Sequence, residues 1–292
     1  MDTSIDPIAY ISPDDLAARM GRADAPLLLD VRREEQFLAS TRMLAGARRC
    51  KPEDVPALAA SEAAREVIVY CVYGHQVSAD SATALRTAGW NARALAGGFA
   101  GGEDGVDLPR DIVRWRAQRP LTMAKRMDWA VTGEQPSRWI TRERPKIDRI
   151  ACPWLIRRFI DPRAEFFYVP TPQVFSEAAR LQAVAYDIPG APVSHEGELC
   201  SFDTLLRAFE LDDPALATLA RIVRGADTDR LELAPQSAGL LALSLGLSKL
   251  HGNDHAMLGA ALPLYDALYA WCRSAQDEPH SWKPETLIGA AP

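Results

Sequence analysis

The stretch VIVYCVYGHQ, residues 67–76, decides the fold of the first half of this 292-residue chain. Its first four residues are β-branched or aromatic, which is typical of a buried strand in a parallel sheet. Cys71 follows directly, and a loop then leads into a helical pattern over residues 79–89. Short apolar runs at 27–31 and 92–95 continue the alternation. Strands that alternate with helices predict an α/β domain built on a parallel sheet.

Cys71 stands where a strand ends and a helix begins. Unpaired backbone N–H groups gather at such a point, so a thiol held there favours its thiolate form and can carry a persulfide. Gly74 lets the loop curl around the sulfur, and His75 can add a hydrogen-bond donor or a positive charge. Asp30 and Arg32 follow an earlier strand to the same sheet edge, where ligands of α/β sheets gather. The alternative is that Cys71 is a small buried core residue.

Four motifs, in this order along the chain, resemble the rhodanese family of sulfurtransferases. They are LDVR at 29–32, GA at 46–47, VYC at 69–71 followed by Gly74, and LAGGF at 95–99. The resemblance covers about residues 8–118. It implies that Cys71 carries sulfur as a persulfide, that Asp30 and Arg32 support the loop, and that sulfur transfer needs no cofactor. A small-molecule sulfur donor and a thiol or cyanide acceptor are the partners it implies.

Departures from the rhodanese pattern bear on the substrate. Val72 and Gln76 occupy the loop in which many rhodaneses carry arginine, and Phe99 is followed by Ala100 where the family often has tryptophan. Fewer fixed positive charges weaken the attraction for a dianion such as thiosulfate. We therefore expect persulfide chemistry at Cys71 with another donor. The lack of an arginine placed to bind phosphate argues against a phosphatase.

Residues 119–138 are predicted to form a linker between a domain at 1–118 and a second domain at 139–292. In the second domain we expect a strand at 165–170 and a short one at 184–188. The remaining pattern predicts helices at 174–181, 202–209, 214–223, 238–250 and 256–272. The expected fold class is an α/β rhodanese-like parallel-sheet domain followed by a mainly α-helical (α+β) second domain.

The second domain opens on an arginine-rich run at residues 141–161. Pro153 could sit at the first position of a helix, where no N–H is needed. Arg149, Arg157 and, further along, Arg224 are then candidates for binding an oxyanion near that helix start. The alternative is a solvated basic face paired with the acidic residues of the same run.

Two polar loops, SHEGELCSFD at 194–203 and RGADTD at 224–229, carry an imidazole and several carboxylates. His195, Asp203 and Asp227 are the candidate metal ligands. One imidazole with two or three carboxylates suits iron, manganese or zinc. The alternative is that these are solvated loop carboxylates, which are common.

The second half also resembles the C-terminal domain of the chromate-resistance protein family of the ChrB type. The resemblance covers about residues 139–275 and includes TRERPKIDRIACPWLIRRFIDP at 141–162, EFFYVP at 165–170, DIPG at 187–190 and the two polar loops. It implies a cytoplasmic role in chromate resistance, with chromate as a candidate ligand. Regulator members of the family carry a different N-terminal region, so DNA binding is not expected here.

Composition sets outer limits on function. A net charge of −6, with 48% hydrophobic and 25% charged residues, is typical of a soluble globular protein and does not favour nucleic acid as a partner. There is no run of 18 apolar residues and no leader-like pattern at Met1, so neither a membrane partner nor secretion is expected. Five widely spaced cysteines, without a CxxC, indicate reduced thiols in the cytoplasm.

The leading hypothesis is a sulfurtransferase that forms a persulfide on Cys71 and is linked to chromate resistance through a metal- or oxyanion-binding second domain. A second hypothesis is a non-catalytic sensor or regulator that responds to chromate or metal, which Val72 and Gln76 favour. A third is a metal-dependent redox enzyme centred in the second domain.

Overall fold

β5 (Glu66–Tyr70) is the central strand of a five-stranded sheet whose order is β1-β6-β5-β2-β4 and whose neighbouring strands all run parallel. The computed structural model describes residues 9–278 of the chain. The other strands of this sheet are β1 (Tyr10–Ile11), β2 (Leu27–Asp30), β4 (Arg48–Arg49) and β6 (Asn91–Leu95). The parallel α/β class predicted for the first half is confirmed, with β5 where the sequence pattern expects it.

Helices connect these strands and cover the sheet. α4 (Gln76–Thr87) starts three residues before the predicted start and buries Ala82 and Leu85. α1 (Pro13–Arg19) is capped by the side chain of Ser12, which accepts a hydrogen bond from the N–H of Asp15. The remaining helices of this half are α2 (Glu34–Ala39), η1 (Pro52–Asp54), α3 (Val55–Ser61) and α5 (Pro109–Ala117).

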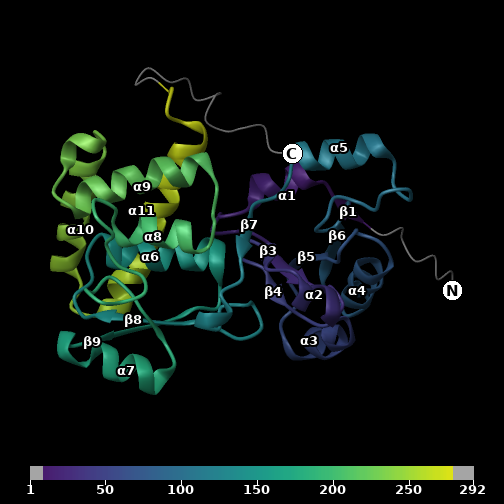
Figure 1. Cartoon of the computed structure of the whole chain (residues 1–292), viewed down its shortest axis with the longest axis horizontal. Helices are drawn as coiled ribbons and strands as arrows, with labels where there is room; N and C mark the ends of the chain where they lie inside the picture. Colours follow the sequence, from purple (N-terminus) through teal and green to yellow (C-terminus); the bar gives the residue numbers. More distant parts are fainter. Residues whose placement is uncertain (1–8, 279–292) are drawn as a thin grey trace.

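The segment predicted to be a linker is hydrogen-bonded to both halves. Its strand β7 (Thr122–Ala124) pairs antiparallel with β3 (Arg42–Leu44), and a short helix, η2 (Met127–Trp129), follows. The N–H of Ala124 donates to the carbonyl of Phe209 in the second half. Figure 1 shows β3 and β7 between the two halves. The domain boundaries themselves stay predictions, and their outer ends, residues 1–8 and 279–292, lie outside the described residues.

The second half is mainly helical, as predicted, around a small parallel sheet in the order β10-β8-β9. Its strands are β8 (Arg138–Arg142), β9 (Glu165–Val169) and β10 (Val184–Ala185), so the last is shorter than the predicted run. Its helices are α6 (Asp148–Leu155), η3 (Ile156–Ile160), η4 (Thr171–Gln173), α7 (Val174–Leu181), α8 (Ser201–Ala208), α9 (Pro214–Asp227), η5 (Leu231–Leu233), α10 (Ser237–Leu250) and α11 (Asp254–Ser274).

The predicted helix start at Pro153 is wrong, because α6 begins at Asp148 and Pro153 lies inside it. Proline lacks the N–H that would bond to the carbonyl four residues earlier. That carbonyl belongs to Arg149, and it accepts a hydrogen bond from the hydroxyl of Tyr186 at 3.4 Å instead. The helix then continues into the π-helical turn η3, a local change that often accompanies an interrupted hydrogen-bond ladder.

One hydrophobic core is shared by the two halves. Leu28 and Tyr70 of the first half belong to the same buried cluster as Trp154 and Phe159 of the second. The packing is close enough that a Cβ on Gly21 would lie 2.1 Å from the ring of Phe159. Among residues 9–278, none of the helices combines the length and the apolar character needed to cross a bilayer.

Candidate functional sites

The first candidate site is the loop between β5 and α4. Cys71 follows the last residue of β5, is 6% exposed, and its Sγ lies 3.3 Å from the hydroxyl of Ser78 on α4. An open pocket of about 450 Å³ lies over this loop. Its lining includes Cys71 and His75, with Arg33, Tyr73 and Glu103 around them. The predicted loop residues therefore lie together, at the carboxyl edge of the sheet.

Gly74 shapes this loop by a positive φ of +81° and by its closeness to another backbone segment. A Cβ at this position would lie 2.7 Å from the N–H nitrogen of Gly98 and from the carbonyl oxygen of Leu95. The N–H of Phe99 donates to the carbonyl of Cys71 at 2.9 Å. The LAGGF motif thus fixes the cysteine loop from behind, which explains why the two motifs occur together.

His75 lies on the wall of the pocket and is held by two carboxylates. Its Nε2 is 2.8 Å from Asp107 and its Nδ1 is 3.5 Å from Glu103. The N–H of Glu103, and His75 itself, hold the pKa of Asp107 below its usual value. No hydrogen bond joins His75 to the thiol of Cys71 in the described part of the chain. His75 therefore lines the pocket with both ring nitrogens directed at carboxylates.

Asp30 and Arg32 form a buried ion pair beneath the loop. Both are at most 1% exposed, and Arg32 Nε lies 2.9 Å from Asp30 Oδ1. The hydroxyl of Tyr70 donates to Asp30 at 2.9 Å, and the guanidinium of Arg32 stacks over Phe99 at 4.4 Å. These contacts join β2, β5 and the LAGGF segment. Neither residue is among those that line the pocket.

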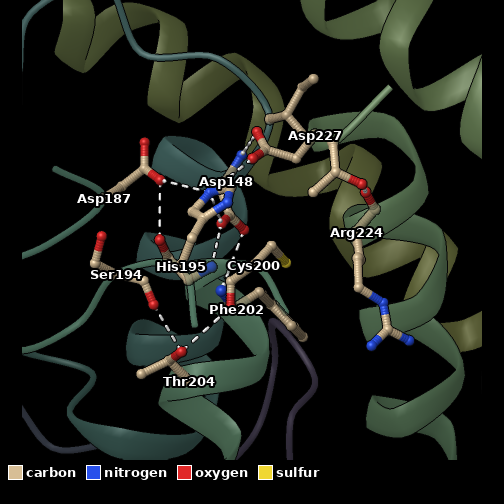
Figure 2. Close-up of polar contacts among 12 residues, drawn as sticks. Asp148, Asp187, Ser194, His195, Cys200, Phe202, Thr204, Arg224 and Asp227 are labelled. Carbon is tan, nitrogen blue, oxygen red and sulfur yellow. Dashed lines mark hydrogen bonds and ion pairs between the residues drawn. The ribbon is translucent and has the colours of Figure 1, made fainter. Parts of the chain in front are cut away.

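The second candidate site is a group of four side chains in the other half, shown in Figure 2: Asp148, Asp187, His195 and Asp227. One ligand atom from each lies within 4.8 Å of the others. His195 Nε2 is 3.1 Å from Asp227, 3.4 Å from Asp187 and 3.6 Å from Asp148. The two inner carboxylates are buried, while the imidazole is 40% exposed and opens the group to solvent.

Each member of this group is positioned by a different element. Asp148 is the first residue of α6, and its carboxylate accepts the N–H groups of Ser201 and Phe202 at the start of α8. Asp187 follows β10 and accepts the hydroxyl of Ser201 at 2.9 Å. Asp227 is the last residue of α9. His195 lies in the loop before α8, and Thr204 anchors that loop by donating to the carbonyl of Ser194.

The charges of this group fit a cation. Burial and the nearby carboxylates of Asp227 and Asp187 raise the pKa of Asp148 well above its usual value. Hydrogen bonds to Asp187 and Asp227 raise the pKa of His195 to about 10. Three carboxylate oxygens with one imidazole nitrogen are a donor set that suits divalent iron, manganese or zinc. A divalent ion would neutralise repulsion that the fold otherwise leaves among the carboxylates.

Backbone strain accompanies the same group. Ile147, directly before Asp148, has a φ of +38°, and Asp187 has a φ of +52°. Positive φ is strained for a β-branched residue and tends to occur at functional sites. The hydroxyl of Tyr265 donates to the carbonyl of Ile147 at 3.1 Å and helps to hold this conformation. Strain at two of the positions that build the group is consistent with a constraint beyond packing.

Asp203, predicted as a ligand, lies outside this group. Its carboxylate accepts the N–H of Cys200 at 3.1 Å and so caps α8. The predicted oxyanion residues also do not converge. Arg149 faces Asp187 at 3.3 Å, Arg224 faces Asp203 at 3.7 Å, and Arg157 lies over the ring of Phe166 at 5.1 Å. These arginines therefore do not form one site.

Asp148 and Asp187 were missed by the sequence reasoning. Asp148 stands among arginines, which favoured its interpretation as an ion-pair partner. Asp187 is the first residue of the DIPG motif and was assigned to a short predicted strand, so it was not considered as a ligand. A useful signal was available for Asp148, because acidic residues favour the first turn of a helix and the helix begins there.

Comparison with known families assigns a separate family model to each half of the chain. Residues 12–104 match the family model described as the rhodanese-like domain, and residues 139–272 match that described as the C-terminal domain of ChrB. The chain joins a rhodanese-like domain to a ChrB C-terminal domain. Both resemblances noted in the sequence are thereby confirmed.

One curated relative is similar to part of the chain. The chain is 35% identical over 139 residues to Protein ChrB of Cupriavidus metallidurans. The aligned region covers 47% of this chain and 41% of the relative, so this chain spans less than half of the relative's length.

Two solved structures are similar to parts of the chain. A rhodanese homologue from the extremely thermophilic bacterium Thermus thermophilus is 25% identical, covers 31% of this chain and 96% of its own, and gives a TM-score of 0.26. An As–Sb reductase from Leishmania major is 16% identical, covers 41% of this chain and 88% of its own, and gives a TM-score of 0.30.

Proposed function

We propose that the rhodanese-like domain transfers sulfane sulfur through a persulfide on Cys71. The observation that carries this proposal is the position of Cys71 at the carboxyl end of β5, on the wall of an open pocket and 3.3 Å from the hydroxyl of Ser78. The first N–H groups of α4 lack partners within the helix, so they favour negative charge at this point. A thiolate or persulfide is the anion that the loop would stabilise.

The reaction consists of two displacements at sulfur. The Cys71 thiolate attacks the transferable sulfur of the donor, and a new S–S bond forms. With thiosulfate the S–S bond of the donor breaks and sulfite leaves with the electron pair. With 3-mercaptopyruvate the C–S bond breaks, and pyruvate leaves as its enolate, which takes up the proton of the donor's thiol. The outer sulfur of the persulfide is then attacked by the thiolate of the acceptor, or by cyanide, and the Cys71 thiolate leaves. The Ser78 hydroxyl donates to the carbonyl of His75, and it would donate to the sulfur in an anionic state by turning its proton away from that carbonyl.

The pocket over the loop favours a donor of low charge. Arg33 is the one arginine or lysine in its lining among the described residues, and Glu103 lies in the same wall. The side chains of Val72, Tyr73 and Val77 supply apolar surface. A thiol-type donor such as 3-mercaptopyruvate matches this lining better than the thiosulfate dianion does.

Mass spectrometry of the intact protein tests this proposal. After incubation with 3-mercaptopyruvate or with thiosulfate, we expect a mass increase of one sulfur atom that Cys71→Ser abolishes. Cys272→Ser is a matched control, because burial raises the pKa of that thiol to about 11 and keeps it protonated. An adduct that persists in Cys71→Ser, or no adduct with either donor, contradicts the proposal.

We infer that the ChrB C-terminal domain binds a divalent metal ion through Asp148, Asp187, His195 and Asp227. The observation that supports this is their mutual distance of at most 4.8 Å around a partly exposed imidazole. A bound ion would act there as a Lewis acid with a side open to solvent. Asp148 and Asp187 would hold the ion from within the core, and the helix start at Ser201 keeps Asp148 in place.

Metal analysis tests this second proposal. We expect iron, manganese or zinc in the purified chain at close to one ion per chain, and a loss of that metal in Asp227→Asn. Asp229→Asn is the matched control, since Asp229 is an exposed carboxylate two residues further on. Equal metal content in both variants contradicts the site.

We also propose a role in chromate resistance, because the second half of the chain matches the C-terminal domain of ChrB. We propose that the chain acts in the cytoplasm. The five cysteines, free and buried, are consistent with a reducing compartment. A sensor or regulator that responds to chromate or metal is the alternative, and Val72 and Gln76 in the loop favour it. Turnover with an acceptor thiol separates the two, because a sensor would bind its ligand and transfer no sulfur.

A further inference from the structure

A cavity of about 190 Å³ lies between the rhodanese-like domain and the ChrB C-terminal domain. Its volume equals that of roughly six liquid water molecules, so it can hold a small anion. Among the described residues, the side chains that line it include six arginines and no carboxylate. The arginines are Arg22, Arg48 and Arg65 from the first domain and Arg157, Arg158 and Arg163 from the second.

The ion pairs around this cavity leave positive charge unmatched. Five of the six guanidinium groups face four carboxylates, because Glu62 serves two of them. The pairs are Arg22–Asp24, Arg48–Glu62, Arg65–Glu62, Arg158–Asp266 and Arg163–Asp161. Six positive charges against four negative ones leave two, which is the charge of a dianion.

Arg157 carries unmatched charge, and Arg163 has a donor group without a hydrogen bond. In the described part of the chain no carboxylate is within ion-pair distance of Arg157, whose guanidinium instead lies over the ring of Phe166. The buried Nε of Arg163 makes no hydrogen bond, and an oxygen of Asp161 is 3.5 Å from it. Burial lowers the pKa of both arginines, so an anion in the cavity would offset the cost of burying their charge.

The cavity is distant from both sites described above. Cys71 comes six positions after Arg65, with β5 between them, and this length of strand spans roughly 20 Å. Arg157 comes nine positions after Asp148 along α6 and η3, which corresponds to about 14 Å. An anion in the cavity therefore contacts neither the Cys71 thiol nor the four-residue cluster around His195.

We propose that this interdomain cavity binds a doubly charged tetrahedral oxyanion, the chemistry shared by sulfate, hydrogen phosphate and chromate. Guanidinium groups recognise such anions by paired, charge-assisted hydrogen bonds. Because the arginines come from both domains, the bound anion joins the two domains at the amino edge of the parallel sheet. The site is separate from the persulfide and metal sites of the proposed function, and it does not depend on either.

Isothermal titration calorimetry of the full chain with sodium sulfate tests the proposal. Ionic strength is held constant with chloride, because sulfate also stabilises proteins without binding to a site. We expect saturable binding of one sulfate per chain, and a Kd at least about tenfold weaker in Arg157→Gln. Arg180→Gln is the control, since that arginine is exposed on α7 and pairs only with Glu177 among the described ion pairs.

The same titration with hydrogen phosphate and with chromate identifies the source of the anion, and displacement of bound sulfate shows that the site is shared. Arg65→Gln, at a side chain that is 55% exposed, is a second variant that the fold should tolerate, and we expect it to weaken binding as well. No saturable binding of any of the three anions overturns the proposal. Equal affinity in Arg157→Gln, Arg65→Gln and the control also overturns it. Persulfide formation and metal content, measured on the same variants, report separately on the proposed function.

Discussion

His195 Nε2 lies 3.1 Å from Asp227 Oδ2, and the two residues come from a loop and from the end of α9. Neither could reach the other without the packing of α9 against α6 and α8, which also brings Asp148 into contact. The arrangement concentrates three carboxylates on one imidazole at the partly exposed edge of a core. The pKa of His195, raised to about 10, keeps the imidazole protonated, and its charge offsets part of the repulsion among the carboxylates. We expect a divalent ion to replace that proton and to offset more of the repulsion.

Asp148→Asn should abolish stabilisation by metal, measured as the difference between the unfolding free energies with and without the ion. The substitution removes the negative charge. Its amide oxygen can accept only one of the N–H groups of Ser201 and Phe202, which donate to different oxygens of Asp148, so the metal-free protein is destabilised as well. For the native chain, a free metal concentration of 100 times the Kd adds about 2.7 kcal/mol to the free energy of unfolding. Thermal unfolding with and without Mn²⁺ or Zn²⁺ measures this difference.

Asp161→Asn is the matched control for that experiment, since Asp161 is also buried and accepts backbone N–H groups from Ser137 and Arg163. It lies outside the four-residue group, so its metal-induced stabilisation should equal that of the native chain. A native-like response in Asp148→Asn would show that the carboxylate is not a ligand.

Ser78→Ala should slow persulfide formation by about tenfold, because the hydroxyl is the side-chain partner of the Cys71 sulfur at 3.3 Å. Ser81→Ala is a close control on the same helix. Both hydroxyls donate to a backbone carbonyl, of His75 for Ser78 and of Val77 for Ser81, but only Ser78 contacts the sulfur among the described hydrogen bonds. Time-resolved mass spectrometry gives the rate of persulfide formation in both variants. Equal rates would show that the Ser78 hydroxyl does not contribute to the reaction.

Gly74→Ala should destabilise the rhodanese-like domain by about 2–4 kcal/mol, since it adds a steric clash to an unfavourable backbone conformation. The new Cβ would lie 2.7 Å from backbone atoms of Leu95 and Gly98. Gly105→Ala separates the two effects, because Gly105 has a φ of +82° but no atom within 4 Å of a Cβ. Its cost should be about 1–2 kcal/mol. Urea unfolding measures both variants, and a similar cost for the two would mean that the loop can shift away from Leu95 and Gly98.

Local patterns in the sequence were sufficient for the cysteine loop and for the strand before it. The apolar run at 67–70 and the loop after it predict β5, Cys71 and Gly74 as they are found, because a strand, a tight turn and a helix start are each set by neighbouring residues. The start of α6 shows the limit of that method. Pro153 favours a first helical position, yet a hydrogen bond from Tyr186, distant in sequence, compensates for the missing N–H and permits it inside the helix.

The four-residue cluster around His195 could not be predicted in full from local patterns in the sequence. His195 and Asp227 lie in loops rich in polar residues and could be selected, whereas Asp148 and Asp187 join them only through the packing of α6, α8 and α9 around the small sheet. Asp203 looked equivalent to them in sequence, but its position in the first turn of α8 makes it a helix cap. The arginine-lined cavity could not be predicted from local patterns either, because its two sets of arginines come from different domains.

Glu66 should make stability depend on pH in the acid range. The hydrogen bond from Arg19, and then that from Arg93, lower the pKa of Glu66 to about 2, from an ordinary value of 4.5. The folded state therefore binds its proton less readily than the unfolded state, so the contribution is fully present above pH 4.5 and is lost as the pH falls towards 2. Glu66→Gln should reduce the dependence of the unfolding free energy on pH below 4.5. It should lower that free energy by no more than about 1 kcal/mol at pH 7, because solvent screens a partly exposed ion pair.

The double variant with Arg19→Gln tests whether the ion pair is responsible. If it is, the two single losses should not add, since each substitution removes the same interaction. Urea unfolding between pH 3 and pH 7 gives the required free energies. Additive losses would assign the pH dependence to other carboxylates. An unfolding free energy that falls as steeply with decreasing pH in Glu66→Gln as in the native chain would do the same.

Tyr70→Phe tests the support beneath the cysteine loop. The hydroxyl of Tyr70 accepts the N–H of Leu44 and donates to Asp30, and both contacts are buried. Their loss leaves a donor without a partner and a carboxylate with one bond fewer, at an expected cost of about 1–3 kcal/mol. Because Asp30 orients Arg32, which stacks on Phe99 behind the loop, the persulfide rate should also fall. Tyr10→Phe, at an exposed tyrosine, should change neither value. A loss of stability without a change in the persulfide rate would show that Asp30 and Arg32 stabilise the fold and do not influence the reaction.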